Sequence, residues 1–376
     1  QGSVAIQGPI GIGKSSLLAR GLLAMEGFGS DNTARSVIAV GDKSASNIDS
    51  VARLLVEAMV SIDEQQRSVR LQPRTLFEHE SAEIVRYFVE GRHLAILKRL
   101  VEKDHLAHLL DTRNYLILAI DEADKCPVPL AQLVRSIVTH TQQRGVLGVR
   151  FLLAGVSPFF QKMVDEDPGI SRFFYKTLSL EPLSAPEAYH LLDSKLQLAS
   201  EWAEEDGHSL AVDDGVLYRV VALSGGHPHL LQLLGSHLIE HEDDEPDGTI
   251  DARDLVSSLN RICYEDRARV YDATLHSLEV HALLEPLQTI MASTRLGFPT
   301  SLDRSYVSRL VGPEDIQRLL EHNVIRVVSD FEYGLVDEFL RIRMLLDAED
   351  PGRRGRLETR LIDWPDYSEE VEGEFD

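Results

Sequence analysis

The segment from Gly8 to Ser15 has residue types and spacing suited to holding a phosphate chain. It reads GPIGIGKS, with three glycines ahead of a lysine and a serine. The glycines let the backbone wrap with its amides pointing inward, and the start of a following helix adds partial positive charge. Lysine here reaches the β- and γ-phosphates, and the serine hydroxyl binds Mg²⁺. We expect the nucleotide to be held by Gly8, Pro9, Gly11, Ile12, Gly13, Lys14, Ser15 and Ser16.

A pair of carboxylates provides the second chemical signal. The apolar residues 115–120 predict a buried strand, and Asp121 and Glu122 follow it directly. Such residues lie at the carboxyl edge of a parallel sheet, beside the phosphate site. We expect Asp121 to hold Mg²⁺ through water, and Glu122 to orient and deprotonate the attacking water. These residues together predict Mg²⁺-dependent hydrolysis of a nucleoside triphosphate.

The elements needed to position these groups are those of an α/β domain. Helical patterns cover residues 14–23, 51–62 and 94–110, and the last two form a long insertion between the second and third strands. Strands alternating with helices predict a parallel sheet with both faces covered. The predicted strands are residues 3–6, 36–40, 115–120, 149–154 and 177–180.

After Pro182 the pattern is helical. Helices are predicted at 186–204, at 213–223, from about 229 and at 250–264, with an acidic loop at 241–247. From about residue 265 three helices precede a hairpin, whose strands at 324–328 and 331–336 flank a polar turn at Ser329 and Asp330. Helices at 314–322 and 337–346 enclose the hairpin, an order that resembles a winged-helix domain. The predicted domains are 1–182 (ATPase core), 183–264 (helical lid), 265–348 (winged-helix-like) and 349–376 (acidic tail).

The combination of motifs resembles the AAA+ and STAND P-loop ATPases, in particular their origin-recognition-like and NLR-like branches. Gly8 to Ser15 corresponds to Walker A, and Asp121 with Glu122 to Walker B. The resemblance implies an adenine nucleotide, and no guanine-recognition motif follows Walker B. Asp121 to Asp124 also spells the box of an RNA helicase family. We discount that interpretation, because the downstream half is helical and no Ser-Ala-Thr segment follows.

The resemblance implies four further site residues. Ser157, after the fourth strand, matches the position that senses the γ-phosphate, although a serine here also suits a turn or helix cap. Arg172 matches an arginine that completes a neighbouring subunit's site, or is an ordinary surface arginine. His227 and Pro228, after Ser224-Gly225-Gly226, match the lid motif in which the proline packs against adenine. A proline starting a helix after a Gly-Gly turn is the alternative.

Composition restricts the partners and the compartment. No apolar run approaches the roughly 20 residues that span a bilayer, so we expect no membrane segment. Two cysteines without metal-ligand spacing favour a reducing, cytoplasmic compartment. The net charge of −23 opposes nucleic-acid binding unless a local basic patch overrides it. The one candidate patch combines Arg341, Arg343, Arg353, Arg354, Arg356 and Arg360 with interspersed carboxylates.

Three functions remain after these considerations. The favoured one is a slowly hydrolysing ATP switch that oligomerises and controls an effector module, for example in bacterial defence. The chain enters its phosphate loop almost at once, so we expect that module upstream of Gln1. The alternative is a DNA-associated ATPase of the initiator or transposition-regulator type, which the acidic segment Gly312 to Glu321 disfavours. A remodelling motor comes third, because no aromatic pore loop is recognisable.

Overall fold

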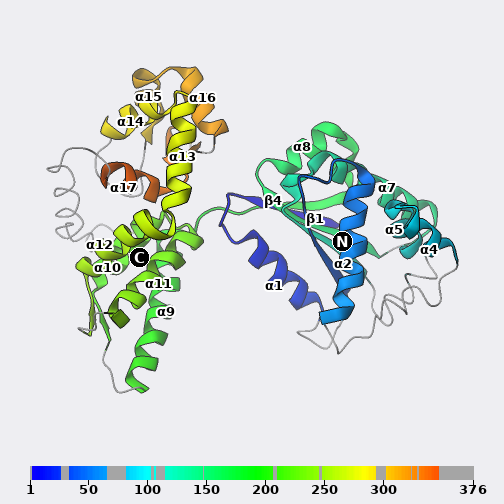
Figure 1. Ribbon diagram of the computed structural model, residues 1–376, viewed down its shortest axis with the longest axis horizontal. Helices are drawn as coiled ribbons and strands as arrows, with labels where there is room; N and C mark the ends of the chain where they lie inside the picture. Colours follow the sequence, from blue (N-terminus) through cyan, green and yellow to red (C-terminus); the bar gives the residue numbers. More distant parts are fainter. Residues whose placement is uncertain are drawn as a thin grey trace. The chain divides into compact units, whose positions relative to one another are not determined.

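The chain divides into two compact units, Gln1–Glu181 and Pro182–Asp376, which are drawn in Figure 1. The computed structural model describes residues 2–26, 34–65, 82–102, 106, 115–146, 148–205, 210–244, 248–293, 302–322, 324–327 and 330–346. The predicted acidic tail lies outside these residues. None of the described helices is both long and apolar enough to cross a membrane.

The first unit is built on a five-stranded sheet whose order is β2-β3-β4-β1-β5 and whose paired strands are all parallel. The predicted α/β class with a parallel P-loop sheet is confirmed. Nearly every residue of β3 and β4 is buried, as expected for central strands covered on both faces. The strands are β1 (Ser3–Gly8), β2 (Ala34–Val40), β3 (Tyr115–Asp121), β4 (Val149–Val156) and β5 (Phe174–Ser179).

Alternate residues of the strands contact helices on opposite faces of this sheet. On one face, α1 (Lys14–Glu26) packs Leu18 and Leu22 against Ile117 and Leu152. On the other face a larger core collects the remaining helices, as Figure 1 shows. These are α2 (Ile48–Gln65), α4 (Ala82–Val89), α5 (His93–Leu100), α7 (Pro127–Gln143) and α8 (Phe159–Glu166), with the 3₁₀ turns η1 (Ala123–Lys125) and η2 (Pro168–Phe173).

One predicted helix is interrupted in the structure. The apolar pattern predicts one helix from 94 to 110, but α5 ends at Leu100 and the chain turns at Val101 and Glu102. Leu106 is helical again, and the other residues from 103 to 110 lie outside the described ones. The Glu102 carboxylate pairs with Arg99 in α5 and lies 3.3 Å from His140 Nε2 in α7. The contact with His140 joins the turn to α7.

The second unit begins as a helical bundle. It contains α9 (Ala185–Glu205), α10 (Asp214–Ser224), α11 (Pro228–Asp244) and α12 (Ala252–Arg261), which continues into a π-helical turn, η3 (Ile262–Asp266). The loop predicted at 241–247 starts too early, because α11 runs to Asp244. Two short strands, β6 (Ala211–Val212) and β7 (Thr249–Ile250), pair in parallel beside the bundle.

The rest of the second unit follows the order expected of a winged-helix domain. Three strands form an antiparallel sheet, β8-β10-β9, and the predicted hairpin is present as β9 and β10. A single hydrophobic core runs from α9 to α17, so these elements and the bundle are packed together. The elements are α13 (Ala268–Val280), α14 (Leu284–Ser293), β8 (Leu302–Asp303), α15 (Arg304–Leu310), α16 (Pro313–Glu321), β9 (Ile325–Val327), β10 (Glu332–Leu335) and α17 (Glu338–Leu346).

Candidate nucleotide-binding site

The phosphate loop connects the end of β1 to the start of α1. Gly11 and Gly13 have φ angles of 79° and 96°, in the left-handed region that side chains disfavour, which explains the glycines at these positions. The Lys14 ammonium donates hydrogen bonds to the carbonyl oxygens of Gly8, at 3.1 Å, and Pro9, at 2.5 Å. The lysine is therefore held over the loop, where a phosphate chain would lie.

The start of α1 supplies the remaining groups of the loop. Ile12 is buried and anchors the loop, whereas Ser15 and Ser16 are exposed in the first turn of the helix. The first N–H groups of a helix have no acceptor within the helix, and the helix dipole adds partial positive charge there. Both serine hydroxyls and these amides are accessible to an anion. The donor set fits a triphosphate with Mg²⁺.

Three carboxylates lie close enough to Lys14 to influence its titration. Burial lowers the pKa of Lys14, and the charges of Asp124, Asp121 and Glu122 oppose this shift. The register of the sheet explains their proximity, because β3 and β1 both pair with β4 and end at the same edge. The sheet thus brings the carboxylates after β3 to the lysine of the loop.

Glu122 occupies an unusual backbone conformation. Its φ and ψ of 50° and 37° lie in the left-handed helical region, which is uncommon for a residue with a side chain. Its N–H donates to Asp121 Oδ1 at 2.9 Å, and the Asp121 carbonyl oxygen accepts from Gly41 N–H at 2.8 Å. The Glu122 side chain is exposed and Asp121 is half-buried. Backbone strain of this kind is often found at functional sites.

Ser157 lies beside the phosphate loop. Gly8 pairs with Val156 in the register of β1 and β4, so the next residue of each strand, Pro9 and Ser157, is at the same edge. Ser157 is exposed there. Its position is compatible with the expected contact to a γ-phosphate, and that role stays a prediction.

Arg172 lies at the opposite edge of the sheet. It is exposed in the last turn of η2, just before β5, and Phe174 of β5 pairs with Ser3 at the start of β1. The loop begins at the other end of β1, about 17 Å away at 3.3 Å per residue. Arg172 is therefore too distant for the site of its own chain.

His227 and Pro228 belong to the second unit. Pro228 is the first residue of α11, and His227 is buried, with its N–H donating to the Ser224 carbonyl oxygen at 2.9 Å. This geometry is that of a tight turn leading into a helix. Their contact with adenine stays a prediction, because they lie in a different unit from the phosphate loop.

Comparison with solved structures indicates the type of fold. The Aeropyrum pernix ORC2 protein in its ADPNP and ADP complexes matches with a TM-score of 0.53 and 15% identity, covering 96% of this chain and 88% of that one. A Walker-type ATPase of Pyrococcus abyssi matches with a TM-score of 0.56 and 15% identity, covering 91% and 90%. No protein-family model and no curated protein sequence matches the chain.

The chain has the fold of an origin-recognition-like AAA+ ATPase. The likeness extends over both units, because more than nine-tenths of the chain is covered in each comparison. At 15% identity it concerns the fold alone. The likeness therefore assigns no role to any single residue of this chain.

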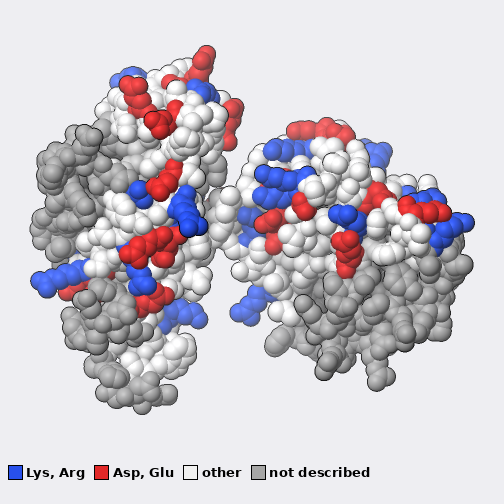
Figure 2. Space-filling view, viewed as in Figure 1, with Lys and Arg blue, Asp and Glu red and all other residues white. Residues whose placement is uncertain are grey.

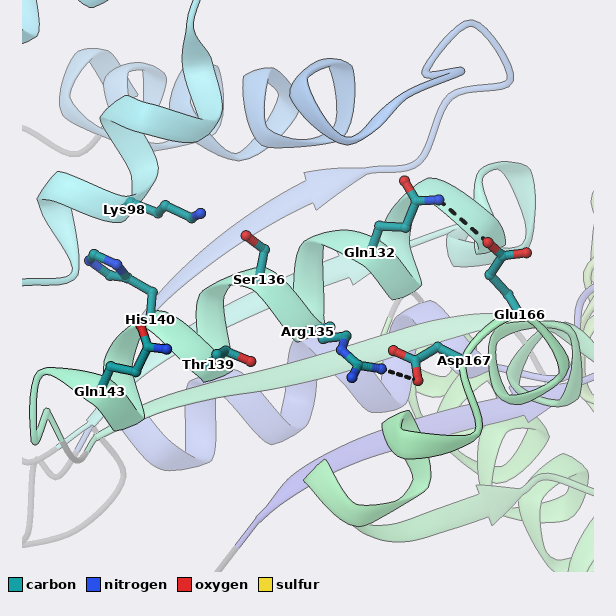
Figure 3. A pocket seen from close by; sticks show the side chains of 9 residues that line it. All are labelled: Lys98, Gln132, Arg135, Ser136, Thr139, His140, Gln143, Glu166 and Asp167. Atoms are coloured by element: carbon teal, nitrogen blue, oxygen red, sulfur yellow. Dashed lines mark hydrogen bonds and ion pairs between the residues drawn. The ribbon is translucent and has the colours of Figure 1, made fainter.

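The first unit carries a polar hollow of about 550 Å³, shown in Figure 3. Lys98 of α5 points toward it from one side. At the other end Arg135 pairs with Asp167, and Gln132 Nε2 lies 3.4 Å from Glu166 Oε1. Its described lining includes no residue of the phosphate loop or of the Asp121 turn. The residues are Lys98, Gln132, Arg135, Ser136, Thr139, His140, Gln143, Glu166 and Asp167.

Sequence reasoning missed three residues of the nucleotide-binding edge. Asp124 belongs to the Asp121–Asp124 box and has no role in the sequence-based prediction, yet it lies near Lys14. Gly41 and Gly155, at the ends of the second and fourth strands, contact the turn after β3 from either side. A glycine directly after a buried strand is the only sequence signal for these contacts, and it does not indicate the partner.

Proposed function

We propose that this chain binds ATP with Mg²⁺ at the Gly8–Ser15 loop and hydrolyses it slowly, as a nucleotide-controlled switch. The observation that carries the proposal is the position of the Lys14 ammonium, which is bonded to the Gly8 carbonyl and lies near enough to three carboxylates for their charges to act on its pKa. A cation and carboxylates at one sheet edge, next to a helix start, suit a triphosphate and a divalent metal.

Each residue then has a distinct role. Lys14 and the amides up to Ser16 would hold the phosphates, while the Ser15 hydroxyl and the Asp121 carboxylate would hold Mg²⁺, which would neutralise phosphate charge. Glu122, exposed at the same edge, accepts the proton of the attacking water. Ser157 donates to the γ-phosphate. For His227 and Pro228, contact with adenine stays a prediction from the lid motif.

Slow turnover follows from two features of the chain. Arg172 lies at the far edge of its own sheet, so it can stabilise transition-state charge only in the site of a second copy. His227 stands where many AAA+ lids carry an arginine. In an isolated chain, neither the Arg172 position nor the lid position of His227 supplies an arginine to the nucleotide site. Homo-oligomerisation would supply Arg172 from a second copy.

For the biological process that the ATPase serves, the comparisons support the DNA-associated alternative better than the effector switch favoured by the sequence. The neighbour with nucleotide complexes is an ORC2 protein, and the fold matches it along both units. We therefore propose an initiator- or regulator-type ATPase whose association with DNA depends on the bound nucleotide.

The charge of the winged-helix region limits how DNA would be contacted. The helix at the recognition position, α16, has Glu314 and Asp315 in its first turn. On the part of the second unit that Figure 2 shows and colours, basic and acidic side chains are interspersed. Major-groove reading by the start of α16 is therefore unfavourable.

Two measurements test this function. Calorimetry with Mg-ATP should show saturable binding at one site per chain, and absence of heat and saturation would overturn the nucleotide proposal. Anisotropy titrations with labelled duplex DNA test the association with DNA. They are carried out with ADP or a non-hydrolysable ATP analogue and over a salt series. We expect affinity that falls with salt and differs between nucleotides. No binding at low salt in either state would exclude the DNA-associated function.

A further inference from the structure

The side chain of Asp124 connects two strand ends that are far apart in the sequence. Asp124 lies in η1, the short turn that follows Glu122. Its Oδ1 atom accepts a hydrogen bond from the backbone N–H of Val156, the last residue of β4, at 2.8 Å in a half-buried position. Ser157 comes next in the chain. The carboxylate thus bonds the turn bearing Glu122 to the strand end bearing Ser157.

A second observation at the same junction is the close approach of Gly155. A Cβ atom on residue 155 would lie 2.9 Å from Asp124 N and 3.1 Å from Asp124 Oδ1, and 3.0 Å from a ring carbon of Phe159. A real Cβ atom essentially never comes within 3.0 Å of a backbone atom, and the other two contacts would also be tight. The end of β4 can therefore rest against Asp124 only because residue 155 is glycine.

We propose that Asp124 is a positioning residue that fixes Ser157 relative to Glu122. The inference rests on the proposed ATPase function and deepens it. If Ser157 donates to the γ-phosphate and Glu122 orients the water, then catalysis depends on the distance between two separate segments. The Asp124–Val156 hydrogen bond and the Gly155 contact set that distance, and neither requires Asp124 to touch the nucleotide.

The proposal distinguishes hydrogen bonding from charge. Asp124→Asn keeps an oxygen that can accept from the Val156 N–H, while Asp124→Ala removes the acceptor. We expect Asp124→Ala to lower kcat about 10- to 100-fold, the usual cost of a misplaced catalytic group. The Kd for ATP should change by less than about threefold, since Lys14 and the loop are untouched. Asp124→Asn should recover most of the lost kcat.

A double-mutant cycle tests whether Asp124 acts through Ser157. On a Ser157→Ala background, Asp124→Ala should cost less than about twofold in kcat, because the group that it positions is already gone. The control is Asp165→Ala on α8, where the carboxylate accepts from Gln161 one helical turn away. That change should leave kcat and Kd as they are.

Hydrogen exchange gives a readout that needs no nucleotide. In Asp124→Ala the amides at the end of β4, and that of Val156 first, should exchange faster than in the wild type, while those of β3 remain protected. Unchanged exchange at Val156, or additive effects of Asp124→Ala and Ser157→Ala on kcat, would overturn the positioning role. ATP binding and hydrolysis by the wild-type chain are measured separately. If they are absent, the proposed function fails; if they are present and Asp124→Ala has no effect, only the positioning role fails.

Discussion

Gly41 lies directly against the carbonyl group of Glu122. A Cβ atom on residue 41 would come within 2.3 Å of the Glu122 carbonyl oxygen and 2.9 Å of the carbonyl carbon. The Gly41 N–H also donates to the Asp121 carbonyl oxygen at 2.8 Å. The end of β2 therefore supports the left-handed turn at Glu122 from one side, as Gly155 supports Asp124 from the other.

Replacing Gly41 should strain this turn. In Gly41→Ala either β2 or the Glu122 peptide must move, and we expect a loss of about 1–3 kcal/mol in the free energy of unfolding. Chemical denaturation measures it. Gly21→Ala is the matched control, because Gly21 lies within α1 with open space around its Cβ position. Alanine there should be neutral or stabilising by up to about 1 kcal/mol. Equal effects at the two positions would contradict the supporting contact.

Lys14→Ala should remove nucleotide binding. The ammonium provides charged hydrogen bonds to phosphate, each of which is worth about 1.5–3 kcal/mol, so we expect the Kd for Mg-ATP to rise about 10- to 100-fold or beyond measurement. Isothermal titration calorimetry is the measurement. Lys162→Ala, at an exposed position of α8, is the charge-matched control and should bind normally. Unaltered affinity in Lys14→Ala would place the nucleotide elsewhere.

Glu122→Gln should separate binding from hydrolysis. The amide keeps the shape of the side chain but cannot take the proton of the attacking water, so kcat should fall about 10²- to 10⁴-fold while ATP remains bound. Single-turnover hydrolysis with labelled ATP, together with the Kd, gives both quantities. Glu166→Gln, on the wall of the polar hollow, serves as the control. Normal turnover by Glu122→Gln would show that another group is the base.

The second unit should lose stability at alkaline pH through Tyr271. Burial, followed by the charge of Asp337, raises the pKa of Tyr271 above its usual value, and its hydroxyl donates to Asp337 Oδ2 at 3.3 Å. In the unfolded chain the Tyr271 hydroxyl ionises near pH 10, whereas in the folded chain it stays protonated to higher pH. The contribution of Tyr271 to the free energy of unfolding is therefore complete below about pH 10 and declines above it. Stability should therefore fall as pH rises through 10.

Tyr271→Phe tests this dependence. Near pH 8 the variant should be less stable by about 1 kcal/mol, because the hydrogen bond to Asp337 is lost. Toward pH 11 the difference should shrink, since phenylalanine does not ionise in the unfolded chain. Thermal unfolding between pH 8 and 11 measures both, with Tyr306→Phe, at an exposed position of α15, as the control. A constant difference across this range would refute the argument.

The sequence by itself determined the groups whose chemistry is local. Gly8 to Ser15 lies between a strand and a helix, and Asp121 with Glu122 ends a buried strand, so the neighbouring residues alone predict their positions. The parallel sheet and the hairpin near the C-terminus follow from short-range apolar patterns in the same way. Each of these features is encoded by a short run of consecutive residues.

Only the tertiary structure decided which distant residues meet. The strand order places the end of β4 between the loop and the Asp121 turn, and this brings Val156 to Asp124 and, from β2, Gly41 to Glu122. It also puts Arg172 at the far edge from the loop. A pattern read along the chain contains neither the order of strands nor the contacts between their ends, because these result from packing segments that lie many residues apart.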